Sequence, residues 1–480
     1  MVTQVEFAAI VPVLIVTLAA CAALLAEALR RKGERMPSGV FGLIGLSGAI
    51  FTSLQQWGLD HVGFGVIVAD DFALFVNVVL CSVGLLTILM SWGTAERDGL
   101  PVGEYHALIL FAIAGMMLMG STNDLLVVFI ALEIMSLAVY VLTGIKRNSE
   151  AGAEGAFKYF VLGAFSSAFF LYGIALAYAA TGSTKLDRIG LAVAASVSDP
   201  SILLVMAMLL LLIGFAFKVS AVPFHMWTPD AYQGAPTLVT AFMSTGVKAA
   251  AFAAFVRVFL SALEPLRGEW IHILTWLSIL TMVVGTVVGV AQSNVKRMLA
   301  YSSIAHAGYL LIGIIAATDA GKSGVLFYLA AYAVTNLGAF GVLAALSTPD
   351  RQHDDIRDFA GLWHERPGLS ALLTVFLLSL GGFPPTVGFI AKWNIFNAAV
   401  QQNLIPLAVL GVLTSVISVF FYLRIVVMMY MTDEKAPAGR PAVPRMAAAG
   451  LLLALVAVFY LGILPGDLLM AARESVKSIF

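Results

Sequence analysis

Residues 214–237 read GFAFKVSAVPFHMWTPDAYQGAPT, and this stretch combines two features that an apolar segment rarely tolerates. Lys218 places an ammonium group in the middle of the run, and Pro223 interrupts it five residues later. A helix that breaks inside a hydrophobic layer frees backbone groups, which can be satisfied only within protein or in a wet cavity. We therefore expect this segment to be a broken helix that faces the interior of a larger assembly of helices.

The composition places the whole chain in a lipid bilayer. The 480 residues are 60% hydrophobic and only 11% charged, whereas soluble domains carry about a quarter charged residues. The net charge of -1 excludes nucleic acid as the main partner, because phosphate binding requires a basic excess. Cys21 and Cys81 both lie in apolar runs, which excludes a disulfide framework and a cysteine-bound iron–sulfur cluster.

Apolar segments long enough to cross a membrane recur along the chain and predict an all-α polytopic protein of about fourteen transmembrane helices. No Lys or Arg precedes the first segment, so we expect it to be a retained helix rather than a signal peptide. The predicted spans are 5–29, 38–56, 72–92, 107–120, 124–145, 156–180, 201–221, 237–262, 270–291, 297–317, 323–346, 369–399, 404–430 and 446–470.

Basic residues in the predicted loops orient these spans. Fifteen follow odd-numbered spans: Arg30, Arg31, Lys32, Arg35, Arg97, Lys146, Arg147, Lys296, Arg297, Arg351, Arg357, Arg366, Lys435, Arg440 and Arg445. Six lie on the other side: Lys185, Arg188, Arg267, Lys322, Arg473 and Lys477. Because cytoplasmic loops carry the excess of Lys and Arg, we expect both termini on the non-cytoplasmic side.

The basic residues that remain within the spans are the ones that point to function. Of the 27 Lys and Arg residues, six are left: Lys158, Lys218, Lys248, Arg257, Lys392 and Arg424. Glu133 is the one carboxylate deep in an apolar run, nine residues after Asp124 and thus roughly 13 Å into the bilayer. Ionisable groups at this depth are costly and commonly mark ion or proton pathways.

A second broken helix repeats the design of the first. The sequence GGFPPTVGFIAKW at 381–393 places Pro384 and Pro385 before Lys392. Interrupted helices in two halves of a chain are typical of inverted-repeat transporters, in which the site lies at the breaks.

These groups suit a proton relay. A buried lysine can be neutral or protonated according to whether a carboxylate lies close, so Glu133 near Lys218 would make a switchable site. Lys248, thirty residues further on, and Lys392 extend the series, and histidine at 306 changes charge near neutral pH.

Each residue also has a structural interpretation. The buried Glu and Lys residues could form fixed ion pairs, and His306 could simply bond a backbone carbonyl. Lys158 and Arg424 lie near span ends, where long side chains extend to the interface. Arg257 does not deprotonate and is more typical of a structural partner for an acidic group or a carbonyl. His225, beside the first break, is either a further functional residue or a loop residue.

Other chemistry finds no support in the sequence. There is no Walker loop, no strand pattern that would precede a dinucleotide-binding glycine motif, and no His or Cys spacing for zinc or haem. Any redox reaction must therefore take place in partner subunits.

Four segments resemble the proton-translocating antiporter-like subunits of respiratory complex I, an NADH–quinone oxidoreductase. They are DLLVVFIALEIMSLAVYVLTG, KYFVLGAFSSAFFLYGIAL, VPFHMWTPDAYQGAPTLVTAFMSTGVKAA and KRMLAYSSIAHAGYLL, and the resemblance extends over nearly the whole chain. Lysine in GFIAKW favours the N-type subgroup of the bacterial enzyme, since the M type typically has glutamate there. Leu238 departs from the proline common in the family, which affects only the local loop.

The resemblance implies roles for individual residues. Glu133 matches the glutamate of the fifth span, Lys218 and Lys392 the lysines of the two broken helices, and Lys248 the connecting lysine, whereas Glu154 and Lys158 match a recurring local pattern. It also implies two inverted five-helix repeats. The expected divisions are an N-terminal segment at 1–106, repeats at 107–265 and 266–432, and a C-terminal helix at 433–480.

The expected function is outward proton pumping driven by NADH oxidation and quinone reduction elsewhere in the complex. The resemblance implies that NADH, FMN, iron–sulfur clusters and quinone bind to partner subunits. It also implies that other membrane subunits of the complex surround this chain. We expect the complex to lie in a bacterial inner membrane. The alternatives are a subunit of a multisubunit cation/proton antiporter, a membrane-bound hydrogenase subunit, and a membrane anchor without transport function.

Overall fold

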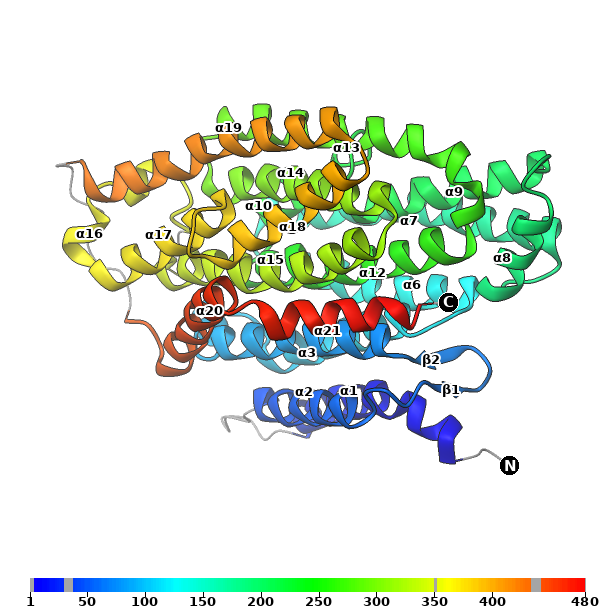
Figure 1. Ribbon diagram of the computed structural model, residues 1–480. Helices are drawn as coiled ribbons and strands as arrows, with labels where there is room; N and C mark the ends of the chain where they lie inside the picture. The colour runs from blue at the N-terminus through cyan, green and yellow to red at the C-terminus, as the bar shows by residue number, and fades with distance from the viewer. Residues whose placement is uncertain (1–3, 30–37, 349–351, 433–441, 480) are drawn as a thin grey trace.

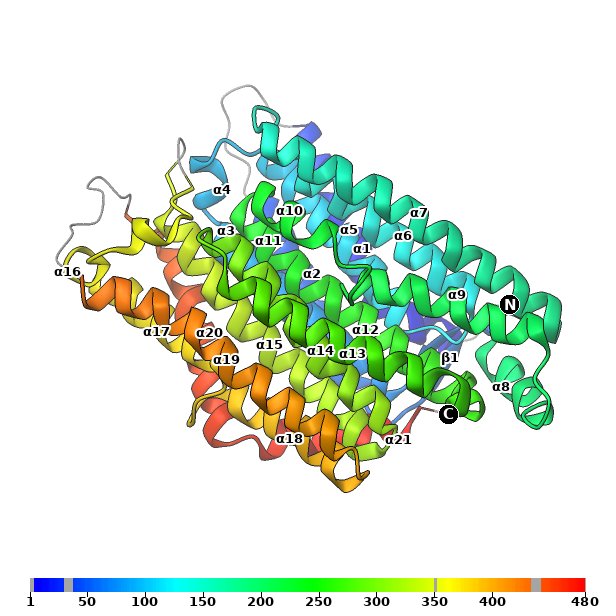
Figure 2. The ribbon, with the colours of Figure 1, turned by 90° about the horizontal axis from the view of Figure 1, so that it is seen from above.

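The computed structural model describes residues 4–29, 38–348, 352–432 and 442–479 as one bundle of helices that run side by side (Figures 1 and 2). Within these residues twelve helices are long and apolar enough to cross a membrane. Two shorter apolar helices, Ile202–Lys218 and Pro367–Gly381, are the first halves of the two broken helices. Together they correspond to the fourteen predicted spans.

The N-terminal part forms one edge of the bundle (Figure 1). Its helices are α1 (Gln4–Ala28), α2 (Ser38–Gln55), α3 (Asp71–Ser91) and α4 (Thr94–Arg97). Strands β1 (His61–Gly63) and β2 (Ile67–Ala69) form an antiparallel hairpin that pairs His61 with Ala69. The prediction of no strand was therefore wrong here, because three residues a side are too few to produce a visible alternation.

The next elements extend from the short connection after α4 to the end of the eighth span. They are α5 (Val102–Gly120), α6 (Leu125–Thr143), α7 (Glu150–Thr181), α8 (Leu186–Ala195), α9 (Ile202–Lys218), α10 (Trp227–Gly234), α11 (Thr237–Phe242), η1 (Met243–Val247), α12 (Lys248–Arg257), η2 (Val258–Ala262) and η3 (Glu264–Leu266). The fourth span, predicted from 107, already begins at Val102, because the polar residues Glu104 and His106 continue the helix.

The remaining helices complete the bundle. They are α13 (Arg267–Val290), α14 (Val295–Ala316), α15 (Asp319–Leu346), η4 (Ile356–Phe359), α16 (Leu362–Glu365), α17 (Pro367–Gly381), α18 (Val387–Gln401), α19 (Ile405–Tyr430), α20 (Arg445–Ile463) and α21 (Gly466–Lys477). The span predicted at 446–470 is thus divided at Leu464 and Pro465, and its second half packs on α15 and α3. The first helix begins and the last helix ends at the same end of the bundle (Figure 1).

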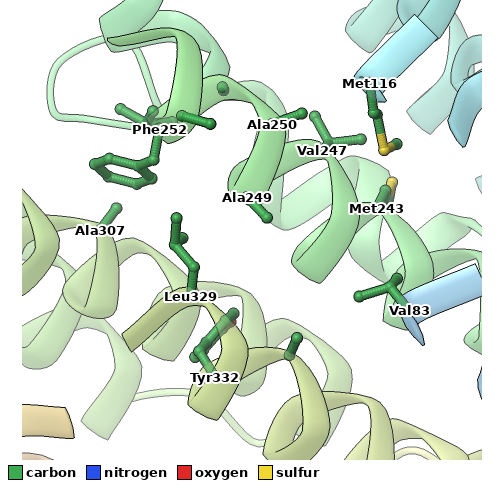
Figure 3. Close-up of a cluster of buried hydrophobic side chains, with 14 of the residues drawn as sticks. Val83, Met116, Met243, Val247, Ala249, Ala250, Phe252, Ala307, Leu329 and Tyr332 are labelled. Atoms are coloured by element: carbon green, nitrogen blue, oxygen red, sulfur yellow. The ribbon is translucent and has the colours of Figure 1, made fainter. Parts of the chain in front are cut away.

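The centre of the bundle is the helical segment Thr237–Ala262, whose hydrophobic window is fully buried. Figure 3 shows its side chains, among them Met243, Val247 and Phe252, packed against residues of α3, α5, α14 and α15. Small residues such as Ala249 and Ala250 let neighbouring helices approach closely, which drives helix packing in lipid. Any charge on this segment must therefore find its partner within the protein.

Two π-helical turns, η1 and η2, flank α12. They lie directly before Lys248 and directly after Arg257, the two charged residues of this segment. Such turns shift the faces of a helix and are frequent at functional positions.

A buried ion pair attaches the N-terminal helices to this centre. The guanidinium of Arg257 donates to both carboxylate oxygens of Asp70, at 2.7 and 2.8 Å, and both side chains are almost fully buried. Asp70 also caps α3 by accepting from the backbone of Ala73, while the backbone of Phe72 donates to Ser478 after α21. This confirms a structural role for Arg257.

We expect Asp70→Ala to destabilise the protein by about 3–5 kcal/mol, because it leaves a buried guanidinium without its counter-charge. Thermal unfolding of the detergent-solubilised protein measures the effect. The double variant Asp70→Ala with Arg257→Met is the matched control and should recover most of the loss, since no unpaired charge remains. Equal loss in the single and double variants would contradict this role of the pair.

Candidate functional site

The first break lies between α9 and α10 and is closed by side chains of the surrounding helices. Trp227 Nε1 donates to the carbonyl of Phe217 at 3.1 Å, and the backbone of Val222 donates to Thr281 Oγ1 at 2.9 Å. The Val222–Pro223 peptide bond is cis. The freed backbone groups thus bond within the protein, as the membrane requires.

Lys218 is the last residue of α9 and is buried at this break. Its Nζ donates to Ser136 Oγ at 2.7 Å and to the hydroxyl of Tyr140 at 3.4 Å, both on α6. Glu133, also on α6, accepts instead from Ser167 Oγ of α7 at 2.5 Å. The two predicted partners therefore bond to different hydroxyls and form no direct hydrogen bond with each other among the described residues.

Lys248 and His306 meet polar groups of α14, α15 and α19. Lys248 Nζ donates to the backbone carbonyl of Ser303 and, at 2.6 Å, to its hydroxyl. The imidazole of His306 pairs with the hydroxyls of Tyr328 at 2.6 Å and Tyr422 at 3.3 Å. The alternative, in which His306 bonds a backbone carbonyl, is not what the structure shows.

The hydroxyl of Tyr422 extends this cluster. It forms a short hydrogen bond with Ser302, the neighbour of the serine that binds Lys248. His306 belongs to α14 itself and follows Ser303 by three residues, so Lys248 contacts the helix that carries the histidine about one turn away from it.

The second break, between α17 and α18, holds Lys392. Its Nζ donates to the carbonyls of Leu380 and Gly381, at 2.8 and 3.0 Å, and to Ser415 Oγ of α19 at 2.7 Å. These carbonyls belong to the last turn of α17 and lack helical partners. The ammonium group therefore occupies the partially negative end of the half-helix.

Two cavities lie at the second break, and Lys392 lines the first of them. One of about 340 Å³ lies between α18 and α19, and its lining is apolar apart from Lys392 and Ser415. The other, of about 10 Å³, is lined by His306, Tyr328, Tyr332 and Leu380 among others. The volume of this second cavity is close to the smallest that holds one water molecule. The cavity lies between His306 with its tyrosine partner Tyr328 and Leu380, whose carbonyl binds Lys392.

The remaining candidates serve mainly as contacts between helices. Lys158 forms ion pairs with Asp230 at 2.8 Å and with Glu154 at 2.6 Å, so it joins α7 to α10 rather than only extending to the interface. Arg297 reaches the same Asp230 carboxylate at 2.6 Å. His225 lies within the first break, and its Nδ1 has no hydrogen-bond partner among the described residues.

Two basic residues cap helices. Arg424 donates to the carbonyls of Val290, the last residue of α13, and of Gln292, so its side chain caps the end of that span. Lys296, predicted as a loop residue, is buried and donates to the carbonyls of Gln233 and Ala235 at the end of α10. Of the fifteen basic residues used for orientation, seven lie outside the described residues: Arg30, Arg31, Lys32, Arg35, Arg351, Lys435 and Arg440.

The hydroxyl partners are what sequence reasoning missed. Ser136, Ser303 and Ser415 each accept from one of the buried lysines. A usable signal exists on α6, where Glu133, Ser136 and Tyr140 follow the spacing of one helix face. No such pattern marks Ser303 or Ser415.

Known proteins similar to this chain form one group. Residues 122–418 match the family described as NADH:quinone oxidoreductase/Mrp antiporter, transmembrane. NADH-quinone oxidoreductase subunit N of Trichlorobacter lovleyi is 43% identical over 438 residues, which are 91% of this chain and 90% of that protein.

Solved structures of membrane complexes also match the fold of this chain. A chain of respiratory complex I from Thermus thermophilus with bound aureothin has a TM-score of 0.80 and 36% identity, covering 96% of this chain and 98% of its own. A chain of the Mrp complex from a Dietzia species has a TM-score of 0.82 at 20% identity, covering 99% of this chain and 97% of that one, which is a likeness of fold alone.

The second break depends on Gly388, where an added Cβ would lie 1.8 Å from the carbonyl oxygen of Ser379. Because a backbone atom cannot move aside cheaply, we expect Gly388→Ala to destabilise the protein by about 1–3 kcal/mol. The measurement is thermal unfolding of the solubilised protein. Gly466→Ala is the control, since no atom lies within 4 Å of its added Cβ, and equal stability of the two variants would refute this packing argument.

Proposed function

Because this chain belongs to the NADH:quinone oxidoreductase/Mrp antiporter family of membrane subunits, we infer that it is the N-type, proton-translocating subunit of an NADH-quinone oxidoreductase. Its part in that enzyme is to move protons outward across the membrane. The oxidation of NADH and the reduction of quinone take place elsewhere in the complex.

The observation that carries this function is the burial of three lysines and a histidine that have hydroxyls and carbonyls as partners. Lys218, Lys248, His306 and Lys392 are at most 6% exposed, and none forms an ion pair among the described residues. A permanent ammonium group with only neutral partners is costly in this medium. Side chains that gain and lose a proton suit the surroundings better than fixed charges.

The proposed route follows the contacts. A shift of Glu133 relative to Lys218 changes the charge that acts on the lysine and so controls whether it keeps its proton. The proton then passes by Lys248 and the cluster of Ser302, Tyr422 and His306 toward Lys392. One water molecule in the small cavity beside Leu380 would join His306 to the second break. Glu154, Lys158 and His225 lie off this route.

We propose the same division of the chain as the resemblance implies. The repeats are 107–265 and 266–432, each with one broken helix that carries a lysine, between the N-terminal segment 1–106 and the C-terminal part 433–480. The excess of basic residues after odd-numbered spans supports a bacterial inner membrane with both termini outside the cytoplasm.

Redox cofactors belong to partner subunits in this proposal. No group of three metal-ligating side chains occurs among residues 4–29, 38–348, 352–432 and 442–479. NADH, FMN, iron–sulfur clusters and quinone are then bound by other chains of the complex.

A subunit of a cation/proton antiporter is the second candidate, supported by the shared family and by the fold of the Mrp chain. Affinity purification of the intact complex separates the two functions. Flavin-containing and iron–sulfur subunits that copurify with the chain support the oxidoreductase. Copurification with small hydrophobic antiporter subunits alone would favour the antiporter.

We expect Lys218→Met to abolish proton pumping coupled to NADH oxidation, because the side chain can no longer carry a proton. The measurement is acidification of membrane vesicles that contain the complex, with assembly judged on native gels. Lys322→Met, at the first turn of α15, is the matched control and should pump normally. Normal pumping by an assembled Lys218→Met complex would refute the assignment of this lysine.

A further inference from the structure

We propose that Tyr140 and Tyr159 form an aromatic cage that holds the protonated side chain of Lys218, Tyr159 through the face of its ring and Tyr140 through its hydroxyl side. The two tyrosines are thereby positioning residues that act through the lysine. The functional part of this proposal rests on the proposed function, since it takes Lys218 as a proton-carrying group.

The distances place the ammonium group against three rings. Lys218 Nζ lies 5.4 Å from the ring centroid of Tyr140, 5.5 Å from that of Tyr159 and 5.8 Å from that of Phe217. Cations within about 6 Å of an aromatic face are attracted by its quadrupole, and the attraction is larger where water is excluded. Lys218 is 1% exposed, so this condition holds.

The hydrogen bonds of Lys218 leave its charge otherwise poorly compensated. Its good acceptor is the neutral hydroxyl of Ser136, while the contact to the Tyr140 hydroxyl is long at 3.4 Å. Lys218 takes part in no ion pair within the described part of the chain. The Tyr159 hydroxyl is buried and has no partner among the described residues, so this tyrosine offers the lysine its ring rather than its oxygen.

The rings are held rigidly in place. Tyr140 meets Tyr159 at 88° with centroids 4.6 Å apart, and Tyr159 stacks on Trp227 at 4.0 Å. Trp227 in turn donates to the carbonyl of Phe217 that the break has freed. The break thus builds the cage, because α10 brings Trp227 against the tyrosine that covers the lysine.

A glycine makes room for the first ring. A Cβ at Gly163 of α7 would lie 2.0 Å from the Tyr140 hydroxyl oxygen and 2.8 Å from the ring carbon that bears it. Any side chain at this position therefore pushes the ring away from its present place. The position offers a way to disturb the cage without changing an aromatic residue.

Other ionisable groups around Lys218 are few. Glu133 lies on α6 three residues before Ser136, the serine that Lys218 bonds, and the two tyrosines contribute from α6 and α7. Lys248, on the packed helix α12, is directed to Ser303 of α14. Lys158 of α7 is engaged with Asp230 and Glu154. Ser136 and the two tyrosines are therefore the contacts that favour the ammonium form when Glu133 bonds to Ser167.

The test compares the pH dependence of proton pumping by vesicles that contain the whole complex. Removal of a ring disfavours the ammonium form, so Tyr140→Leu and Tyr159→Leu should each move the alkaline limit of pumping to lower pH by about one unit. Tyr159→Phe keeps the ring and loses only a hydroxyl without a partner among the described residues, so it should shift the limit far less than Tyr159→Leu. Gly163→Ala should shift the limit in the same direction as Tyr140→Leu.

The control is Tyr172→Leu, which removes an exposed tyrosine from the same helix α7 and should change nothing. An unchanged profile in both Tyr140→Leu and Gly163→Ala would overturn the cage. So would equal shifts in Tyr159→Phe and Tyr159→Leu, since the ring of Tyr159 would then have no part in the effect. If a leucine variant fails to assemble on native gels, Gly163→Ala decides, because it retains every ring. If instead the proposed function is wrong, the Lys218→Met complex will pump protons normally, which is a different result from any of those above.

Discussion

The structure depends on one constraint: lipid cannot hydrogen-bond, so every backbone group and every charge at membrane depth must find its partner inside the protein. Both broken helices obey it in the same way. At the first break, Trp227 and Thr281 bond the freed backbone groups, and at the second the freed carbonyls of Leu380 and Gly381 bind Lys392 directly. A helix interruption thus supplies polar groups where the surrounding medium has none. Lys392 binds such groups directly, whereas Lys218 at the first break bonds hydroxyls of α6.

The same constraint explains why the central segment, which is the most buried of the spans, holds its two charged residues in specific contacts. Thr237–Ala262 is enclosed by other helices, so Lys248 and Arg257 can be accommodated on it only by specific partners. Their partners differ in kind. Arg257 keeps its charge and has a bidentate carboxylate, which makes a permanent structural link to α3. Lys248 has only a serine hydroxyl and carbonyl, a setting that suits a group whose charge changes.

Much of the architecture could be predicted because its signals are long and chemically extreme. Apolar runs of twenty residues located the spans, and the pairing of proline with lysine located both breaks. Short or polar features were not predicted. The hairpin at His61–Gly63 and Ile67–Ala69 has too few residues to show the alternation of a strand. The division of the last span at Pro465 was not predicted either, because the helix after it, α21, is amphipathic rather than uniformly apolar.

For the site, the sequence by itself determined which ionisable groups lie at membrane depth, since the cost of burying a charge makes each of them conspicuous. Only the tertiary structure decided their partners. Serine and tyrosine are common in apolar helices, so nothing distinguishes Ser303 or Tyr422 until α14 meets Lys248 of α12 and Tyr422 of α19. The same holds for Tyr159, which reaches Lys218 because a residue beyond the break, Trp227, stacks on it. The apolar residues around a charged residue in the sequence indicate how deep it lies in the membrane. Its contacts in space depend on how separate helices pack, and the residues that determine this packing are spread over the whole chain.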